Sequence, residues 1–197
     1  MRCQKPPITA SPKCDEAVTD SRLLQQGITT IRKEYSFGII GYKIVSQTPK
    51  YLLIQHRYNR EWGFPKGHYE KHENRNGSDT AKREFREETG LEFTMTDPNG
   101  QNGNVISVDW DHPFVSHYDF TRGHGDRRRL HKKWTVLFAA EISEFAKPRI
   151  DRPQEIGDIK WMTKHQFDRK NKHREYKEIL AKLDATLLNI IRLTGKV

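Results

Sequence analysis

The sequence predicts an α/β fold, and three observations support this prediction. A largely apolar, β-rich stretch at residues 35–45 is followed by a second such stretch at 51–56, as expected for two strands. A charged segment at 80–89 contains no Gly or Pro, which is typical of a helix. From about Arg174 onward, apolar residues repeat at the spacing of one helix face. Strands, a central helix and a closing amphipathic helix are therefore expected to pack together.

Length and composition fit one domain of ordinary size. The chain has 197 residues, of which 34% are hydrophobic and 31% charged. No apolar run approaches the roughly 18 residues of a membrane span, so we expect no membrane partner. The net charge of +9 suits a polyanionic partner without identifying it. We expect residues 1–33 to be an N-terminal extension, with a helical turn at 22–26, and residues 34–197 to be the domain.

Further strands and loops are expected along the domain. Between the first two strands, Pro49 lies in a turn predicted at 46–50. The segment at 57–67 is expected to be a loop. Later strands are predicted at 91–95, 105–109, 115–120, 134–140 and 156–162, with a Gly/Asn loop at 97–104.

The segment around residues 78–90 has clear start and stop signals of a helix. Ser78 and Asp79 can accept the N–H groups of a first turn, and Gly90 suits the left-handed residue after a last turn. Ala81 and Phe85 are four residues apart, so both can face the core. This places the charged side chains of the segment on the other face of the helix.

Three of those charged side chains are carboxylates at spacing i, i+3, i+4. Glu84, Glu87 and Glu88 leave one face, where like charges repel unless water or a cation neutralises them. A solvated acidic face is the plain alternative to a metal site. Carboxylate oxygens are hard donors that suit Mg²⁺ or Mn²⁺, and Arg83 lies one turn before Glu87 and can fix its rotamer. We interpret this face as a metal site.

The pattern Gly67-x5-Glu73…Arg83-Glu84-Phe85-x-Glu87-Glu88-x-Gly90-Leu91 resembles the Nudix box, the catalytic motif of the Nudix hydrolases. One departure is that nine residues, rather than seven, separate the first Glu of the pattern from its Arg. The surplus falls in a turn-forming stretch at 74–77, where added length costs little. The resemblance implies an α/β/α sandwich with a mixed central sheet and a catalytic loop–helix–loop. It also implies hydrolysis of a phosphoanhydride in a nucleoside diphosphate linked to another group.

The resemblance also implies roles for individual residues. Glu84 and Glu88 would be the chief ligands of Mg²⁺ or Mn²⁺, Glu87 a third ligand or proton acceptor, and Arg83 an orienting residue. The carbonyl of Gly67 would complete the metal shell. Several Nudix branches place a Glu just before a short late strand, as ligand or general base. Glu155 stands at such a point, and a plain loop acid is the alternative.

Residues outside the box are most similar to the asymmetrical diadenosine tetraphosphatases within this family. The similarity covers the lead-in at 62–68, the start of a late strand at 132–136, and Tyr118. In those enzymes a Tyr before the late strand stacks on adenine. Packing within the sheet is the alternative for Tyr118. We expect the substrate, a nucleoside polyphosphate, to contact Lys66, His68, Tyr118, Lys132 and Lys133.

A basic segment at 121–133 carries six Lys or Arg against one Asp. It is either a solvated hairpin tip or a clamp for phosphates. This charge also suits RNA pyrophosphohydrolases and decapping enzymes, which share the lead-in and the box. Hydrolysis at an RNA 5′ end is therefore the alternative function. Diphosphoinositol polyphosphates are a third anionic substrate class, and an RNA-binding subunit without turnover is the alternative from another class.

The two cysteines, Cys3 and Cys14, lie in a Pro-containing leader and imply no disulfide framework. A reducing compartment such as the cytoplasm is therefore expected. Residues 1–14 are basic and contain no acid, which is similar to a mitochondrial transit peptide, the alternative localisation. Their three prolines interrupt an amphipathic helix. The sequence carries no signal for an oligomeric state.

Overall fold

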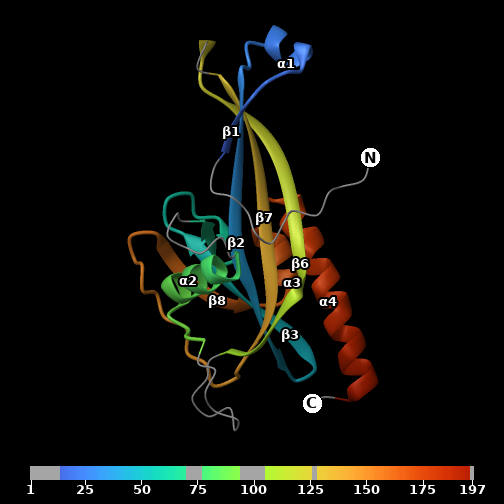
Figure 1. The fold of residues 1–197 in the computed structure, drawn as a ribbon. Helices are drawn as coiled ribbons and strands as arrows, with labels where there is room; N and C mark the ends of the chain where they lie inside the picture. The colour runs from blue at the N-terminus through green and yellow to red at the C-terminus, as the bar shows by residue number, and fades with distance from the viewer. Residues whose placement is uncertain (1–13, 70–76, 94–104, 126–127, 196–197) are drawn as a thin grey trace.

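The computed structural model describes residues 14–69, 77–93, 105–125 and 128–195. A mixed sheet of eight described strands has one helix on one face and two on the other, which confirms the predicted α/β/α sandwich (Figure 1). Among these residues, no helix combines the length and apolar character that a membrane crossing requires. In chain order the elements are β1 Cys14–Ala17, α1 Ser21–Gln25, β2 Thr30–Val45, β3 Thr48–His56, β4 Trp62–Gly63, β5 Lys66–His68, α2 Gly77–Thr89, β6 Val105–Arg122, β7 Arg129–Ile142, β8 Ile156–Met162, α3 Lys164–Lys170 and α4 Arg174–Thr194.

Strand β2 organises the sheet. One of its edges pairs with β7 in the one parallel pairing among the described strands. The other edge pairs in turn with β1 at 30–33, with β5 at 36–38 and with β3 at 42–45, always antiparallel. Outside these, β6 pairs with β7, and both β4 and β8 pair with β3. The three-residue strand β5 therefore lies against the middle of β2, which is where the predicted box begins.

Side chains of β2 alternate between two cores, as expected for a strand buried on both faces. Ile39 packs with Ala81 and Phe85 of α2 on one side. Ile40, on the other side, packs in the second hydrophobic core, to which α3, α4 and several strands contribute. Gly38 must lack a side chain, because a Cβ there would lie 2.2 Å from the carbonyl oxygen of Pro65. This close approach brings the chain into β5.

The turn between β2 and β3 is shorter than predicted. Ser46 and Gln47 have φ values of 49° and 60°, so these two residues alone join the strands. Positive φ at both positions matches the twist of a two-residue hairpin. The prediction of a turn at 46–50 was therefore too long, since Thr48 and Pro49 already pair with β2.

The two strands predicted at 105–109 and 115–120 belong to one strand, β6. Its register against β7 shifts between Asp109 and Phe114, and the Asp109 carboxylate accepts the backbone N–H groups of Asp111 and His112 there. The gap in the sequence prediction marks this irregularity. The predicted hairpin tip at 121–133 is shorter than that segment, because β6 continues to Arg122 and β7 begins at Arg129, its pairing partner.

Helix α2 confirms the central helix and starts earlier than expected. It begins at Gly77, so Ser78 and Asp79 lie in its first turn. A Cβ on Gly77 would lie 2.2 Å from the Phe37 ring, which explains a glycine at this position. Gly90 has φ 65°, the predicted left-handed stop. Residues 91–93 form no strand, and the rest of the strand predicted at 91–95 lies outside the described residues, as does the loop at 97–104.

Helix α3 was not predicted, although the sequence carries its signal. Thr163 accepts the backbone N–H of Gln166, and the Gln166 side chain accepts the backbone N–H of Thr163. This reciprocal pair is a capping box. Helix α4 begins at Arg174, as predicted.

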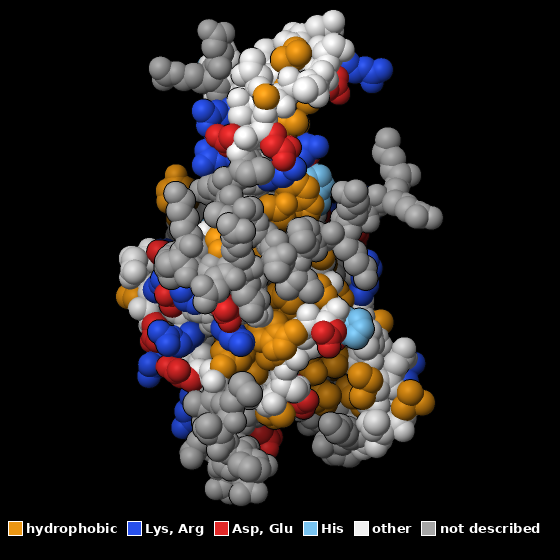
Figure 2. All heavy atoms as spheres, viewed as in Figure 1, with side chains coloured by type: hydrophobic (Ala, Val, Ile, Leu, Met, Phe, Trp, Pro, Cys, Tyr) orange, Lys and Arg blue, Asp and Glu red, His pale blue; other side chains and the backbone are white. Residues whose placement is uncertain are grey.

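The predicted N-terminal extension contributes to the sheet. Its described part forms β1, α1 and the start of β2, and the predicted boundary between residues 33 and 34 falls inside β2. With the far ends of β6 and β7 these elements form an arm beyond the helical layers (Figure 1). Acidic and basic side chains lie side by side near its base (Figure 2). Among the ion pairs of these strands, Asp15 contacts Arg32 and Arg129. The division into extension and domain stays a prediction.

One buried hydrogen bond ties the sheet to α4. The Tyr51 side chain is fully buried, and its hydroxyl donates to the Asp184 carboxylate at 2.7 Å. We expect Tyr51→Phe to lower the free energy of unfolding by about 1–3 kcal/mol, the usual cost of losing a hydrogen bond to a charged group. Urea denaturation measures this change. Tyr58→Phe, at a fully exposed position, is the matched control. Equal stability of the two variants would contradict the assignment.

Candidate active site

Glycine at position 67 makes room for a carboxylate of α2. A Cβ on Gly67 would lie 2.0 Å from Cδ and Oε1 of Glu84. Glu84 is 7% exposed and therefore lies pressed against the backbone of β5. Burial raises the pKa of the Glu84 carboxyl, and the Arg83 guanidinium opposes that shift. The box glycine thus fixes where this acid lies.

Glu88, one helical turn further on, is also held by β5. It is 4% exposed, and its Oε2 accepts the backbone N–H of Lys66 at 2.8 Å. Burial raises the pKa of Glu88 to about 8, while Lys66 acts in the opposite direction. A carboxylate that loses this much solvation is stabilised in its charged form by a nearby cation.

Arg83 fastens the helix face to β5. Its Nη1 donates to Oε1 of Glu84 at 2.7 Å and to Oε2 of Glu87 at 2.9 Å. Its Nη2 donates to the carbonyl oxygen of His68 at 3.1 Å. The predicted contact between Arg83 and Glu87 is therefore present. It orients the two acids and the strand opposite them together.

Arg152 is a site residue that the sequence analysis missed. From the segment before β8, its Nη2 lies 2.6 Å from Oε2 of Glu87, and its Nη1 lies 3.5 Å from Oε2 of Glu155. Glu155 directly precedes β8, as predicted, and its negative charge helps to raise the pKa of Glu88. The structure thus brings Glu155 to the acidic face of α2. A basic residue three positions before Glu155 was the available signal.

The carboxylates of Glu84, Glu87 and Glu88 do not point toward one common ion position in this structure. Within the described ranges, no group of three His, Cys, Asp or Glu side chains has an arrangement that holds a metal ion. Glu84 and Glu87 turn to Arg83, and Glu88 turns to the Lys66 N–H. The donor set itself fits Mg²⁺ or Mn²⁺, since it consists of carboxylates beside backbone carbonyls. Side chains four apart on a helix are neighbours, so a rotamer change would let Glu84 and Glu88 share an ion. Glu73 lies outside the described residues.

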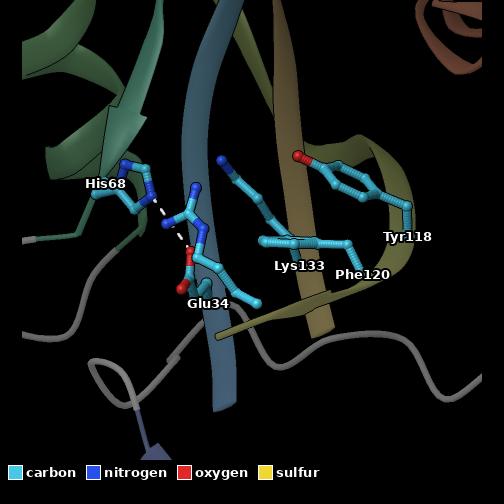
Figure 3. A pocket seen from close by; sticks show the side chains of 6 residues that line it. Glu34, His68, Tyr118, Phe120 and Lys133 are labelled. Atoms are coloured by element: carbon cyan, nitrogen blue, oxygen red, sulfur yellow. Dashed lines mark ion pairs between the residues drawn. The ribbon is translucent and has the colours of Figure 1, made fainter. Parts of the chain in front are cut away.

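Beside the acids lies a cavity of about 340 Å³. Three of the predicted substrate contacts, His68, Tyr118 and Lys133, line it together (Figure 3). Lys132 is not among its lining residues, because neighbouring residues of a strand point to opposite faces of the sheet. The full lining is Glu34, His68, Tyr118, Phe120, Arg122 and Lys133.

Strand β5 joins the cavity to the acids. Lys66 bonds Glu88, Gly67 lies against Glu84, and His68 lines the cavity. Consecutive strand residues advance about 3.3 Å, so the cavity begins within two residues of the carboxylates. Burial raises the pKa values of both Tyr118 and Glu88, and the positive charge of Lys66 lowers both. The cavity and the acids therefore both border β5, and the charge of Lys66 reaches both.

A row of neighbouring aromatic rings, Tyr118, Phe120 and His131, lies along the cavity wall. Tyr118 is 42% exposed and lies 5.8 Å from the Phe120 ring. Phe120 stacks on His131 at 4.8 Å, and His131 Nδ1 lies 2.8 Å from Oε1 of Glu34. Glu34, Phe120 and Arg122 were not predicted as site residues from the sequence. An acid inside an otherwise β-rich segment was the one available signal for Glu34.

A model of the NUDIX domain matches residues 38–183, which is most of the chain. The chain belongs to the Nudix family. It is therefore a hydrolase acting on pyrophosphate bonds, in a family that acts on nucleoside polyphosphates and generally uses divalent metal ions. The match includes α2, β5 and Glu155. The prediction of a Nudix hydrolase from the box is confirmed.

Solved Nudix structures share the fold at low identity. The Ap4A hydrolase of C. elegans, as a binary complex, is 19% identical with a TM-score of 0.55, over 79% of this chain and 98% of that one. A NUDIX hydrolase of Listeria monocytogenes is 18% identical with a TM-score of 0.59, over 79% and 95%. The NUDIX domain of Shewanella oneidensis NrtR, complexed with ADP ribose, is 15% identical with a TM-score of 0.55, over 90% and 100%. At these identities the likeness shows the fold alone.

A viral relative is closer in sequence over a short stretch. A protein of Invertebrate iridescent virus 3, 111R, whose name gives hydrolase as a provisional function, is 50% identical over 48 residues. That stretch is 24% of this chain and 27% of the viral protein. The chain therefore matches about a quarter of that relative's length.

Proposed function

We propose that this Nudix hydrolase cleaves bis(5′-nucleosyl) tetraphosphates asymmetrically, so that diadenosine tetraphosphate yields ATP and AMP. The observation that carries the proposal is that one short strand, β5, contacts the acids of α2 through Lys66 and Gly67 and lines the cavity through His68. A nucleoside in the cavity places its 5′-phosphates along Lys66 toward Glu84 and Glu88. The cavity volume suits one such group, since ligand pockets start at about 300 Å³.

Side chains of the cavity supply base and phosphate contacts. The Tyr118 ring is a platform for a base, and such stacking contributes about 1–3 kcal/mol. Lys133 and Arg122 bring positive charge to the same cavity, and Lys66 carries it to the acids. Arg is suited to phosphate because its planar donors bind two oxygens at once. His68 adds a ring nitrogen at the junction.

The acids of α2 supply the chemistry. Glu84, Glu87 and Glu88, with the carbonyl of Gly67, would hold Mg²⁺ or Mn²⁺. When bound, such an ion neutralises phosphate oxygens and lowers the pKa of a coordinated water. Glu155 or Glu87 takes the proton from the attacking water, and Arg83 and Arg152 hold Glu87 in place. The water oxygen bonds to phosphorus, and the bridging oxygen leaves with the remaining nucleotide.

The product pattern tests this proposal. Purified protein with diadenosine tetraphosphate and Mg²⁺ is expected to release ATP and AMP in equal amounts, measured by anion-exchange chromatography. Parallel reactions contain 5′-triphosphorylated RNA, capped RNA and a diphosphoinositol polyphosphate. Two ADP molecules per substrate, or faster turnover of any parallel substrate, would contradict the proposal. Binding of RNA with no turnover of any substrate would favour the subunit alternative.

Tyr118 provides a test of the base platform. We expect Tyr118→Ala to raise KM for diadenosine tetraphosphate by about fivefold to a hundredfold, because one stacking contact is lost, and to change kcat little. Asp119→Ala is the matched control, since Asp119 is the next residue on β6 and is not among the residues that line the cavity. Steady-state kinetics distinguishes the outcomes. An unchanged KM in the Tyr118 variant would show that its ring only packs in the sheet.

The described arm gives the RNA alternative less support than the sequence did. Part of its basic charge is neutralised, since Asp15 contacts Arg32 and Arg129, and Glu16 contacts Lys33. Proteins that follow an RNA chain need a continuous basic surface. We therefore keep the dinucleotide as the proposed substrate.

A further inference from the structure

Glu34 is an acid in a cavity that otherwise suits a polyanion. Its side chain is 11% exposed and lines the cavity together with Lys133 and Arg122. Figure 3 shows Glu34 and His68 on one side of the cavity and Tyr118 on the other, with Lys133 between them. A carboxylate repels phosphate groups, so phosphate binding does not explain an acid at this position. Glu34 and Tyr118 line the same cavity from different sides, so a base held there can meet both side chains.

Glu34 is held in one orientation. Its Oε1 lies 2.8 Å from Nδ1 of His131, whose ring is in turn fixed by stacking on Phe120. Its Oε2 lies 3.7 Å from Nε2 of His68, and its Oε1 also lies 3.8 Å from Nε of Arg32. A carboxylate has about four lone-pair positions, so these contacts are compatible with further hydrogen bonds from a ligand. Such support is what a group that reads a ligand requires.

A carboxylate accepts hydrogen bonds and donates none when ionised, which distinguishes the purines. The Watson–Crick edge of guanine presents two adjacent donors, N1–H and the 2-amino group, beside the acceptor O6. Both donors can bond one carboxylate while O6 faces an ammonium group such as that of Lys133. Adenine presents one donor, its 6-amino group, beside the acceptor N1. Its edge therefore gives one hydrogen bond to the carboxylate in place of two.

We propose that the cavity recognises a guanine base through Glu34, and that guanosine polyphosphates are the preferred substrates. The direction in which the phosphates leave the cavity rests on the proposed function. The choice of guanine rests on the side chains of the cavity alone. A good bidentate contact to a base edge discriminates by about tenfold to a hundredfold. Adenosine compounds still bind through Tyr118, more weakly.

Calorimetric titration of GDP, IDP and ADP without metal tests the preference. The wild-type protein is expected to bind GDP at least about tenfold more tightly than ADP. IDP lacks the 2-amino group and is expected to fall between them. Glu34→Gln is expected to bring the GDP to ADP ratio close to one, because an amide offers one acceptor beside a donor. Glu16→Gln, an exposed acid of β1 paired with Lys33, should keep the wild-type ratio.

Equal affinity of the wild-type protein for GDP, IDP and ADP would overturn the inference, as would an unchanged ratio in Glu34→Gln. The comparison of GDP with IDP needs no variant, so it decides the matter even if Glu34→Gln fails to fold. Turnover is not measured. A protein that prefers GDP yet leaves diadenosine tetraphosphate intact would therefore refute the proposed reaction and support the base assignment.

Discussion

Replacing Glu88 by Gln is expected to lower kcat/KM for diadenosine tetraphosphate by at least about a hundredfold. The amide oxygen can still accept the Lys66 N–H, so shape and backbone contact are kept. The carboxylate that would hold the divalent ion beside the phosphates is lost, which costs several kcal/mol of transition-state stabilisation. The variant should be no less stable than the wild type, because a neutral amide avoids the burial cost that raises the pKa of Glu88 to about 8.

Steady-state kinetics and thermal unfolding of the same preparation check both halves of this expectation. Glu178→Gln removes an exposed acid of α4 that pairs with Arg174, far along the chain from the site, and should keep wild-type kinetics. If the Glu88 variant kept more than about a tenth of the wild-type kcat/KM, Glu88 would not be essential to the reaction.

Gly67→Ala should produce a comparable loss of activity through a different cause. The added Cβ would lie 2.0 Å from the carboxyl end of Glu84. That end belongs to a flexible side chain, so the collision moves the carboxylate and leaves the backbone in place. We expect kcat/KM to fall by at least about a hundredfold, with a change in unfolding free energy below about 1 kcal/mol.

Gly63→Ala is the matched control, because a Cβ at Gly63 would meet nothing within 4 Å. Both variants receive the same kinetic and urea-denaturation measurements. Wild-type activity in the Gly67 variant would show that Glu84 does not need its position against β5. Unfolding of that variant would show that the backbone, rather than the carboxylate, gives way.

The sequence predicted the helix of the site well, since local rules decide it. The spacing of Glu84, Glu87 and Glu88 and the stop at Gly90 depend on helical periodicity and on one backbone conformation. The contact of Arg83 with Glu87 also follows from one helical turn. These features depend on residues only a few positions apart, so they can be predicted from a single sequence.

Strand β5 and its role could not be predicted in the same way. Three residues are too few to show a period, and their strand conformation comes from pairing with β2, some thirty positions earlier. Arg152 and Glu34 were missed for a similar reason, because their partners lie far away in the sequence. Lys132 and Lys133 were both predicted as substrate contacts, but they are neighbours on β7 and point to opposite faces of the sheet, so that only Lys133 lines the cavity.

Titration of the protein with Mn²⁺, followed by electron paramagnetic resonance of the unbound ion, tests the central claim most directly. The claim is that the acids facing β5 bind a divalent cation after a change of rotamer. Wild-type protein is expected to remove Mn²⁺ from solution, and Glu84→Gln and Glu88→Gln are each expected to weaken that binding by at least about tenfold. Absence of binding, or equal binding by the wild type and both variants, would contradict it.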